Sequence, residues 1–389
     1  MNTREKFLSV VNFNKKCEVP NWEFGYWYDT IKRWYSEGLS KINPPYIRKY
    51  RQGVSGEALS SILDVFEDSS NYYGSDIKEY FGFDKRVHSV PLYAPPLPFF
   101  DKEVYSEDKD NIVFKREDDG KIVKTRKDGT SMPLFLEFPV KGRSDFEKIK
   151  ERFDPDHPLR MPDNFEEKIK DYKKRDYVLQ LGGTLFSGFF SILREMMGLE
   201  TTLLYFYDDP KFLEEMLEFF TDYYIKLNRK VISNVEVDFI FIWEDMCYRN
   251  GPLISPEHFR KYILPYYKRF ISAMKEDGIK NFFVDTDGNC EALIPLFIEG
   301  GVSGLLPFEV QSGIDIEKIR AKHPELIIMG GIDKNALSKG KNEIKKEIEK
   351  AKRMIKSGGF IPYTDHLVPP DVSFENYKFF RNELKKILN

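Results

Sequence analysis

The run Val237-Asp-Phe-Ile-Phe-Ile-Trp243 decides the fold class, because it is an apolar segment of strand length that ends at a pair of acids, Glu244 and Asp245. Such a run of aromatic and β-branched residues predicts a strand that is buried on both faces of a sheet. A helix is expected next, from Ser255-Pro256 to about residue 275, since serine caps helices well and proline suits the first turn. A strand followed by a helix is typical of a parallel sheet.

The same alternation repeats along the C-terminal two-thirds of the chain. Residues 177–181 predict a strand, and Asp209-Pro210 predicts the start of a long helix whose apolar residues recur at helical spacing. Further strands, each followed by a helix, are predicted at 281–285, 302–306, 326–329 and 359–362. About six β/α units, without a GxGxxG motif after an early strand, favour a (β/α)8 (TIM) barrel over a doubly wound sheet.

The N-terminal third departs from this rhythm. We expect a first strand within residues 19–28 and a helix within 30–37. At 104–140, Asp118-Asp119-Gly120 lies between two alternating runs and Asp128-Gly129 marks a second turn, which indicates an antiparallel β-hairpin insertion. The chain is therefore expected to form a single α/β barrel domain over residues 1–389, with an N-terminal helical extension and this insertion.

The composition is that of a folded protein without a bias toward nucleic acids or membranes. Hydrophobic residues make up 41% of the 389 residues, and 33 Phe and 22 Tyr are far more than a disordered chain carries. The 60 basic residues face 63 acidic ones, so the basic excess of a general nucleic-acid binder is missing. No apolar run approaches the ~18–20 residues of a membrane span, and the start has no signal-peptide core. The three cysteines, at 17, 247 and 290, lack CxxC spacing, so we expect a cytoplasmic protein with free thiols.

Candidate functional residues stand directly after the predicted strands, where the active site of a barrel lies. Asp285 and Asp287 follow one strand and lead into Gly288, whose backbone freedom would let both acids turn toward the same site. His366 follows the last strand beside Asp365 and suits a metal ligand or a general acid. A turn, a helix cap or a surface-loop histidine is the structural alternative for these residues.

Two more acids, Glu244 and Asp245, end the most apolar strand and need partners there. Arg194 and Arg249 are the basic residues suited to pair with them. The alternatives of a general base, a metal ligand and a structural ion pair stay open for these acids.

Aromatic residues near the predicted first strand suggest a binding lip. Trp22, Tyr26 and Trp27 would suit a flat ligand, such as a tetrapyrrole or an aryl ring, whereas Phe24 is expected in the core. The cysteines beside the predicted site are expected to behave as small buried apolar residues, with Cys290 the better reserve ligand.

Several short motifs, in their order and spacing, resemble the uroporphyrinogen decarboxylase superfamily over nearly the whole chain. The motifs are Pro20-Asn-Trp22, Gly182-Gly-Thr-Leu-Phe186, Arg194-Glu-Met-Met-Gly198, Trp243-Glu-Asp-Met246, Gly251-Pro-Leu-Ile-Ser-Pro256, Asp285-Thr-Asp-Gly-Asn289, Pro307-Phe-Glu309, Gly330-Gly-Ile-Asp-Lys334 and Asp365-His366. The resemblance implies a (β/α)8 barrel, in agreement with the alternation of strands and helices.

One branch of this superfamily consists of cofactor-free decarboxylases that remove acetate carboxyls from a tetrapyrrole. Their first strand carries a Trp-x-Met-Arg-Gln-Ala-Gly-Arg signature whose arginines bind the substrate carboxylates. The matching residues 22–29 contain no arginine and bring in Glu23 and Asp29, which are the wrong charges for a polyanionic substrate.

The other branch, the zinc methyltransferases, moves a methyl group between a corrinoid protein and a thiol such as coenzyme M. Its metal ligands, a His-x-Cys pair and a later Cys, match Asp285, Asp287 and His366 in this chain. The resemblance therefore implies a divalent metal, zinc or else iron or manganese, with Glu244 as an extra ligand or anchor.

We therefore expect a methyltransferase that works with a corrinoid protein or cobalamin, with His366, Glu244 and Asp285 in catalysis. The residues expected to contact its substrate are Trp22, Tyr26, Trp27, Asp245, Arg194 and Asp365. The alternatives are a cofactor-free decarboxylase of a tetrapyrrole or another carboxylated ligand, with His366 as general acid, and a non-catalytic barrel that binds a tetrapyrrole or corrinoid. A homodimer or a contact with a corrinoid protein is also expected, because an open barrel end must admit a bulky macrocycle.

Overall fold

Parallel strands form the centre of the molecule. The computed structural model describes residues 1–41, 75–127 and 133–388. Within them, one seven-stranded parallel sheet runs in the order β1-β6-β7-β10-β11-β12-β13. The strands are β1 (His88–Ser89), β6 (Leu179–Gly182), β7 (Phe239–Trp243), β10 (Phe282–Asp285), β11 (Gly304–Leu306), β12 (Ile327–Met329) and β13 (Phe360–Ile361). Pairing of each strand with the next along the chain confirms the predicted barrel-like α/β fold.

An extended N-terminal segment lies between the two edge strands of the sheet, β1 and β13, and makes backbone contacts on both sides. On one side, Tyr26 forms a parallel bridge with Val368, beyond β13. On the other side, the backbone N–H of Asp84, shortly before β1, donates to the carbonyl of Asn21 at 3.2 Å. The predicted first strand is thus present as one bridge residue in extended chain, and α2 (Tyr28–Ser36) begins earlier than expected.

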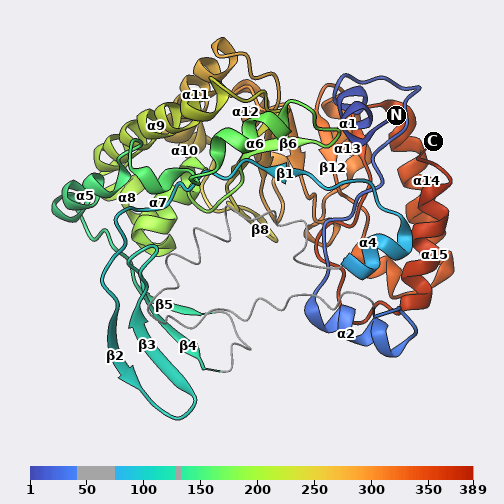
Figure 1. Cartoon of the computed structure of the whole chain (residues 1–389), viewed down its shortest axis with the longest axis horizontal. Coiled ribbons are helices and arrows are strands. Elements are labelled where there is room, and N and C mark those ends of the chain that lie inside the picture. The colour runs from blue at the N-terminus through green and yellow to red at the C-terminus, as the bar shows by residue number, and fades with distance from the viewer. Residues whose placement is uncertain (42–74, 128–132, 389) are drawn as a thin grey trace.

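Helices lie along the outside of this sheet (Figure 1). They include α1 (Thr3–Val11), α4 (Ser75–Phe81), α5 (Arg143–Lys150), α6 (Phe165–Tyr172), α7 (Phe189–Met197), α8 (Leu199–Asp208), α9 (Pro210–Ile232), α12 (Ile294–Glu299), α13 (Ile316–Lys322), α14 (Lys341–Ser357) and α15 (Phe374–Lys385). The side chain of Asp209 accepts a backbone hydrogen bond at the start of α9, as predicted, and that of Ser373 does so at the start of α15. In the part of the chain that the structure describes, no helix has both the length and the apolar character to cross a membrane.

The helix after Ser255 is interrupted, whereas the sequence predicts a continuous one. The short α10 (Pro256–His258) passes through a π-helical turn at Phe259–Ile263 into α11 (Leu264–Glu276). Pro265 lies in the first turn of α11 and has no N–H, so it cannot form the regular hydrogen bond to the preceding turn. The π-helical turn accommodates this missing hydrogen bond.

A separate antiparallel sheet forms the predicted insertion. Its strands, in the order β2-β3-β4-β5, are β2 (Glu103–Glu107), β3 (Asn111–Lys115), β4 (Ile122–Arg126) and β5 (Leu134–Glu137). Figure 1 shows this sheet extending away from the barrel beside α7 and α8. The Asp128-Gly129 turn lies outside the described residues, and the single-domain organisation stays a prediction.

Glu244, directly after β7, is completely buried and binds the start of α7. Its carboxylate accepts hydrogen bonds from the backbone N–H groups of residues 189–191 at 2.8–2.9 Å and from the hydroxyl of Tyr267 at 2.6 Å. A carboxylate at this position satisfies N–H groups that a helix leaves free and complements the helix dipole. Gly188 makes the approach possible, since a Cβ there would lie 2.9 Å from the Glu244 carboxyl carbon. Strand β7 is thereby tied to α7.

Asp365 has a comparable role after β13. Its fully buried carboxylate accepts hydrogen bonds from the backbone N–H groups of Val310 (2.8 Å) and Lys334 (3.0 Å). These contacts join the segments that follow β11 and β12. Burial raises the pKa of Asp365 to about 6, although the charge of Lys334 and the two backbone hydrogen bonds act in the opposite direction.

Replacing Glu244 by Gln should lower the free energy of unfolding by about 1–3 kcal/mol, because an NH2 group would replace one oxygen that accepts backbone hydrogen bonds. Urea denaturation measures this change. The matched control is Glu276→Gln at the exposed end of α11, which should change stability by less than about 0.5 kcal/mol. A Glu244→Gln protein as stable as the control would contradict the role of this carboxylate in the fold.

The contribution of Asp365 to stability should fall as the pH rises. Its folded pKa of about 6 exceeds the value of about 3.9 in an unfolded chain, so the fold favours the protonated form. The stabilisation is complete below about pH 4 and is lost as the pH rises through 6. The unfolding free energy of the wild type, relative to Asp365→Asn, should therefore fall by up to about 3 kcal/mol between pH 4 and 7. Urea denaturation across this range tests the slope, and a difference that does not change with pH would refute it.

Candidate functional site

A cavity of about 590 Å³ opens at the carboxyl ends of β7, β10, β11 and β12. Residues that follow these strands line it: Asp245, Cys247, Tyr248, Arg249, Asp287, Gly288, Glu309, Gln311, Ser312, Lys334 and Asn335. This is the face on which barrel enzymes carry their active sites. It is therefore the candidate functional site.

Three aspartates influence one another beside this cavity. Burial raises the pKa of Asp285 well above its ordinary value, and the nearby charges of Asp287 and Asp245 raise it further. Burial also raises the pKa of Asp245, against the lowering effect of Arg194. The bend predicted at Gly288 is present: its φ is 74°, and a Cβ there would lie 2.7 Å from a backbone carbonyl oxygen. The carboxyl groups of Asp285 and Asp287, at the end of β10, therefore lie close enough for their charges to interact.

His366 lies next to Asp287, as the barrel position of the two residues predicts. Its Nε2 is 3.6 Å from Asp287 Oδ2, and 24% of its side chain is exposed. The ring of Phe24 packs against the imidazole with 5.1 Å between ring centroids. Phe24 is half-buried and packs against the hydrophobic core, as predicted, and its ring also borders the site through His366. An imidazole held beside a carboxylate can accept or donate a proton near neutral pH.

Arg194 of α7 reaches the cavity by binding Asp245. Its Nη1 donates to the carbonyl oxygen of Asp245 at 2.7 Å and to its Oδ2 at 3.1 Å. The guanidinium also lies 5.1 Å from the ring centre of Trp243. Asp245 has φ 43°, a left-handed conformation that residues other than glycine rarely adopt. Strained backbone of this kind is held by its surroundings and is concentrated at functional sites.

Sequence reasoning misses two charged residues of the cavity, Glu309 and Lys334. The Nζ of Lys334 lies 3.1 Å from Glu309 Oε1, and Glu309 Oε2 accepts a hydrogen bond from the backbone N–H of Gly288 at 3.0 Å. Both residues come shortly after a strand, β11 or β12. A position shortly after a barrel strand is the signal that identified Asp287 and His366, and it could have identified Glu309 and Lys334 as well.

Of the predicted site residues, Asp245 and Asp287 line the cavity, Arg194 and His366 contact them, and the aromatic residues, Glu244 and Asp365 are not part of the lining. Trp22 and Tyr26 are buried, and each side chain hydrogen-bonds elsewhere in the core. Glu244 and Asp365 are occupied by the buried backbone contacts described above. Trp27, at the start of α2, is 51% exposed and is the accessible member of the predicted aromatic lip.

The charge of Glu23 is balanced inside the barrel. Its carboxylate lies 3.3 Å from Nη1 of Arg381 and accepts hydrogen bonds from the hydroxyl of Tyr377 (2.9 Å) and the backbone of Thr364 (2.9 Å). Glu23 therefore does not present an unpaired negative charge to a substrate. The charge of the site depends on the cavity acids instead.

The predicted metal ligands do not form a complete site in this structure. Within residues 1–41, 75–127 and 133–388, no three His, Cys, Asp or Glu side chains converge in a group that could hold a metal ion. Asp287 and His366 are neighbours, but Asp285 does not complete a ligand set with them. Burial raises the pKa of Cys247 to about 12 and also raises that of Cys290, so neither thiol readily becomes a thiolate ligand. The arrangement does not fit the implied metal, and metal binding stays a prediction.

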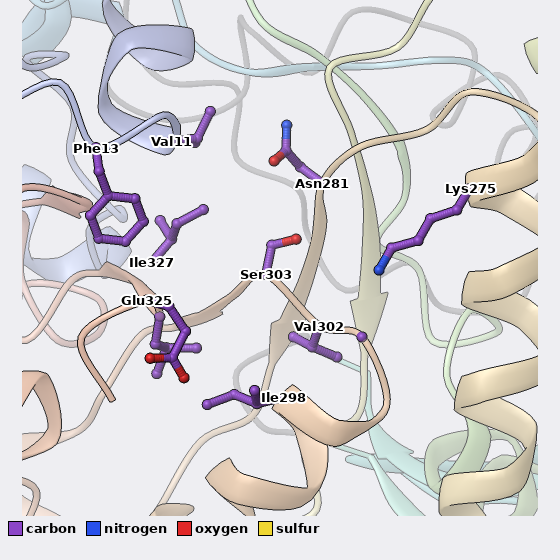
Figure 2. Close-up of a pocket in the computed structure, with 11 residues that line it drawn as sticks. Val11, Phe13, Lys275, Asn281, Ile298, Val302, Ser303, Glu325 and Ile327 are labelled. Atoms are coloured by element: carbon purple, nitrogen blue, oxygen red, sulfur yellow. The ribbon is translucent and has the colours of Figure 1, made fainter. Parts of the chain in front are cut away.

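A second hollow, of about 320 Å³, lies at the opposite ends of the strands (Figure 2). Figure 2 shows Val11, Phe13 and Lys275 around it, together with two polar side chains, Asn281 and Ser303. These two already bond to backbone: Asn281 Nδ2 donates to a carbonyl at 3.1 Å, and Ser303 Oγ accepts from an N–H at 3.2 Å. This face of a barrel usually serves stability, so the first cavity remains the candidate site.

Comparison with known proteins agrees with this architecture. Among solved structures, the chain is similar to a methyltransferase from Methanosarcina mazei at 12% identity, with 100% of both chains covered and a TM-score of 0.61. It is also similar to a B12-independent methionine synthase from Shewanella sp. W3-18-1 at 12% identity, covering 96% of this chain and 97% of that chain with a TM-score of 0.45. At 12% identity, the likeness to the methyltransferase concerns the fold alone, and the likeness to the methionine synthase is too distant to bear on it.

No curated protein matches the chain. The family model of uroporphyrinogen decarboxylase (URO-D) matches residues 128–387. This span covers more than half of the chain and includes every strand from β5 onward. The protein therefore belongs to the uroporphyrinogen decarboxylase (URO-D) family.

Proposed function

We propose that this protein is a methyltransferase that takes a methyl group from a corrinoid, free or held by a partner protein, at the cavity beside β7 and β10. Membership of the family and a fold shared with a methyltransferase over the full length of both chains support an enzyme of this kind. The corrinoid and a homodimer remain part of the proposal. The observation that carries the choice of reaction is the charge of the cavity.

Three acids and two cations of the described chain line this cavity. Asp245, Asp287 and Glu309 are the acids; Lys334 is paired with Glu309, and Arg194 of α7 is paired with Asp245. Arg249 is the lining cation that has no ion pair with a described residue. Among the described residues, Arg249 is thus the one lining cation left to bind the carboxylates of a substrate that carries several of them, beside an acidic Asp287. Methyl transfer to a neutral thiol does not require the cavity to bind several carboxylates. The cavity therefore favours methyl transfer over decarboxylation of a tetrapyrrole.

In this proposal, His366 and Asp287 handle the proton of the methyl acceptor. The imidazole takes the proton of an acceptor thiol while the sulfur forms its bond to the methyl carbon. The carbon–cobalt bond of the donor breaks, and its electron pair stays on the departing corrinoid. Asp287, whose Oδ2 is 3.6 Å from the imidazole, stabilises the imidazolium that results. Burial and the nearby charges of Asp287 and Asp245 raise the pKa of Asp285, which lies beside them.

The experiment mixes the pure protein with methylcobalamin and a panel of thiols, with and without added Zn²⁺, Fe²⁺ or Mn²⁺. Loss of the methylcobalamin absorbance together with a methylated thiol would support the proposal. Release of CO₂ from a coproporphyrinogen-type substrate, without methyl transfer, would replace it by the decarboxylase alternative. Tight binding of either macrocycle with no turnover would instead support the non-catalytic alternative, a protein that only binds the macrocycle.

The variants His366→Ala and Asp287→Asn should lower the rate of methyl transfer by about 10²–10⁴-fold, the usual contribution of a general base. The rate with a thiol of low pKa, which needs no base, should fall less than the rate with an ordinary thiol. The control is His323→Ala, at the end of α13 and away from the cavity. Equal losses with both kinds of thiol would contradict the role of the imidazole as a base.

The metal prediction is tested separately from activity. Protein purified without chelators is analysed for metal content and titrated with Zn²⁺, Fe²⁺ and Mn²⁺ by calorimetry. If Asp285, Asp287 and His366 close around an ion, near-stoichiometric binding should appear in the wild type and disappear in His366→Ala. Metal-free protein that binds none of the three ions would end the prediction.

A further inference from the structure

A row of six alternating charges runs from the four-stranded sheet to the cavity. It begins in the β3–β4 connection with Arg116, Asp119 and Lys121, and continues through Glu195 and Arg194 of α7 to Asp245. Each neighbour in the row has the opposite sign, and Arg116 at its start also pairs with Asp118 at 2.6 Å. The two ends lie on different sheets, and α7 links them.

The first half of this row is deeply buried. The side chains of Asp119 and Lys121 are each 2% exposed, and Lys121 Nζ lies 3.2 Å from Asp119 Oδ2 and forms a short ion pair with Glu195 Oε2. Burial alone would raise the pKa of Asp119, but Arg116 and Lys121 outweigh it and hold the pKa below its usual value. A buried ion pair of this kind adds little net stability compared with apolar packing, whereas removal of one partner leaves an uncompensated charge. Stability alone therefore gives little reason for the pairs to be there.

The second half of the row ends on a strained residue of the cavity. Arg194 lies between two carboxylates: its Nε is 3.9 Å from Glu195 Oε1, and its Nη1 is 3.1 Å from Asp245 Oδ2. Asp245, in its left-handed conformation, also receives a hydrogen bond from Arg194 at its carbonyl oxygen. The position of the guanidinium therefore depends on how much negative charge Glu195 presents, and Lys121 sets that charge.

We propose that Lys121 is a positioning residue for the cavity: by neutralising Glu195 it leaves Arg194 free to hold Asp245, so that docking of the four-stranded sheet on α7 completes the site. This inference rests on the cavity being the functional site but not on methyl transfer as its reaction. Without the Lys121 charge, Glu195 attracts Arg194 more strongly, and Asp245 loses the partner that holds its backbone and carboxylate.

The ring of Trp243 offers a readout that needs no substrate, because Arg194 lies over it. The chain has four tryptophans, so protein labelled with 5-fluorotryptophan should give four fluorine NMR signals, with that of Trp243 identified by Trp243→Phe. In Lys121→Met the Trp243 signal should shift by more than its linewidth while the other three stay in place. Lys121→Arg, which keeps the charge, should return it to the wild-type position.

Two further variants keep the test decisive. Lys115→Met removes a partly exposed ion pair with Glu103 on the same sheet and should leave the Trp243 signal unchanged. If Lys121→Met does not fold, the double variant Lys121→Met/Glu195→Gln removes one charge of each sign and should restore folding. In the double variant the Trp243 signal should return to its wild-type position, because Glu195→Gln leaves no charge on that side chain to draw Arg194 away from Asp245. A wild-type Trp243 signal in folded Lys121→Met, a displaced signal in the double variant, or an equal shift in Lys115→Met would overturn the proposal. These outcomes do not depend on whether methyl transfer is found.

Discussion

The buried carboxylate of Glu244 is the contact on which the geometry of the cavity depends. It receives three backbone N–H groups at the start of α7 and the hydroxyl of Tyr267 on α11, so one side chain connects strand β7 to two helices. Asp245 follows Glu244 directly, and Arg194 lies on the helix that Glu244 binds. The distance between these two partners is therefore fixed by a residue that never reaches the cavity.

The order of strands in the sheet explains why the remaining acids gather at one place. β7, β10 and β11 are adjacent and parallel, so the residues after their carboxyl ends face a common opening. Like charges then raise the pKa of Asp285 in addition to the effect of burial. Hydrogen bonding by Arg194 counters part of this repulsion for Asp245. Two of the three described lining acids are thus paired with Arg194 and Lys334, and Arg249 is left for the carboxylates of a substrate, which bears on which substrates can bind.

Sequence reasoning identified six of the seven strands of the parallel sheet, most helix starts and the neighbourhood of Asp287 and His366, because each depends on short-range patterns or on position after a barrel strand. It missed the short strand β1 (His88–Ser89) and placed the first strand at residues 19–28. It could not separate Asp245 and Asp287, which line the cavity, from Glu244 and Asp365. All four acids follow strands, and only the packed structure reveals their partners. The aromatic lip failed for a similar reason. Trp22 and Tyr26 lie close to Phe24 in the sequence, yet they pack in the core while Phe24 contacts His366.

The four-stranded sheet adds a buried contact to the URO-D barrel of this chain. The barrel alone accounts for the position of the cavity, yet the basic residue that neutralises Glu195 comes from outside the barrel, next to β4. Because Lys121 is buried, its charge could not be tolerated there without the carboxylates of Asp119 and Glu195. Those carboxylates in turn would be costly without Lys121, so the sheet and α7 require each other to dock. Arg194 directly precedes Glu195 in α7. A change in this docking would therefore reach Asp245 through direct contacts and not through a distant conformational change.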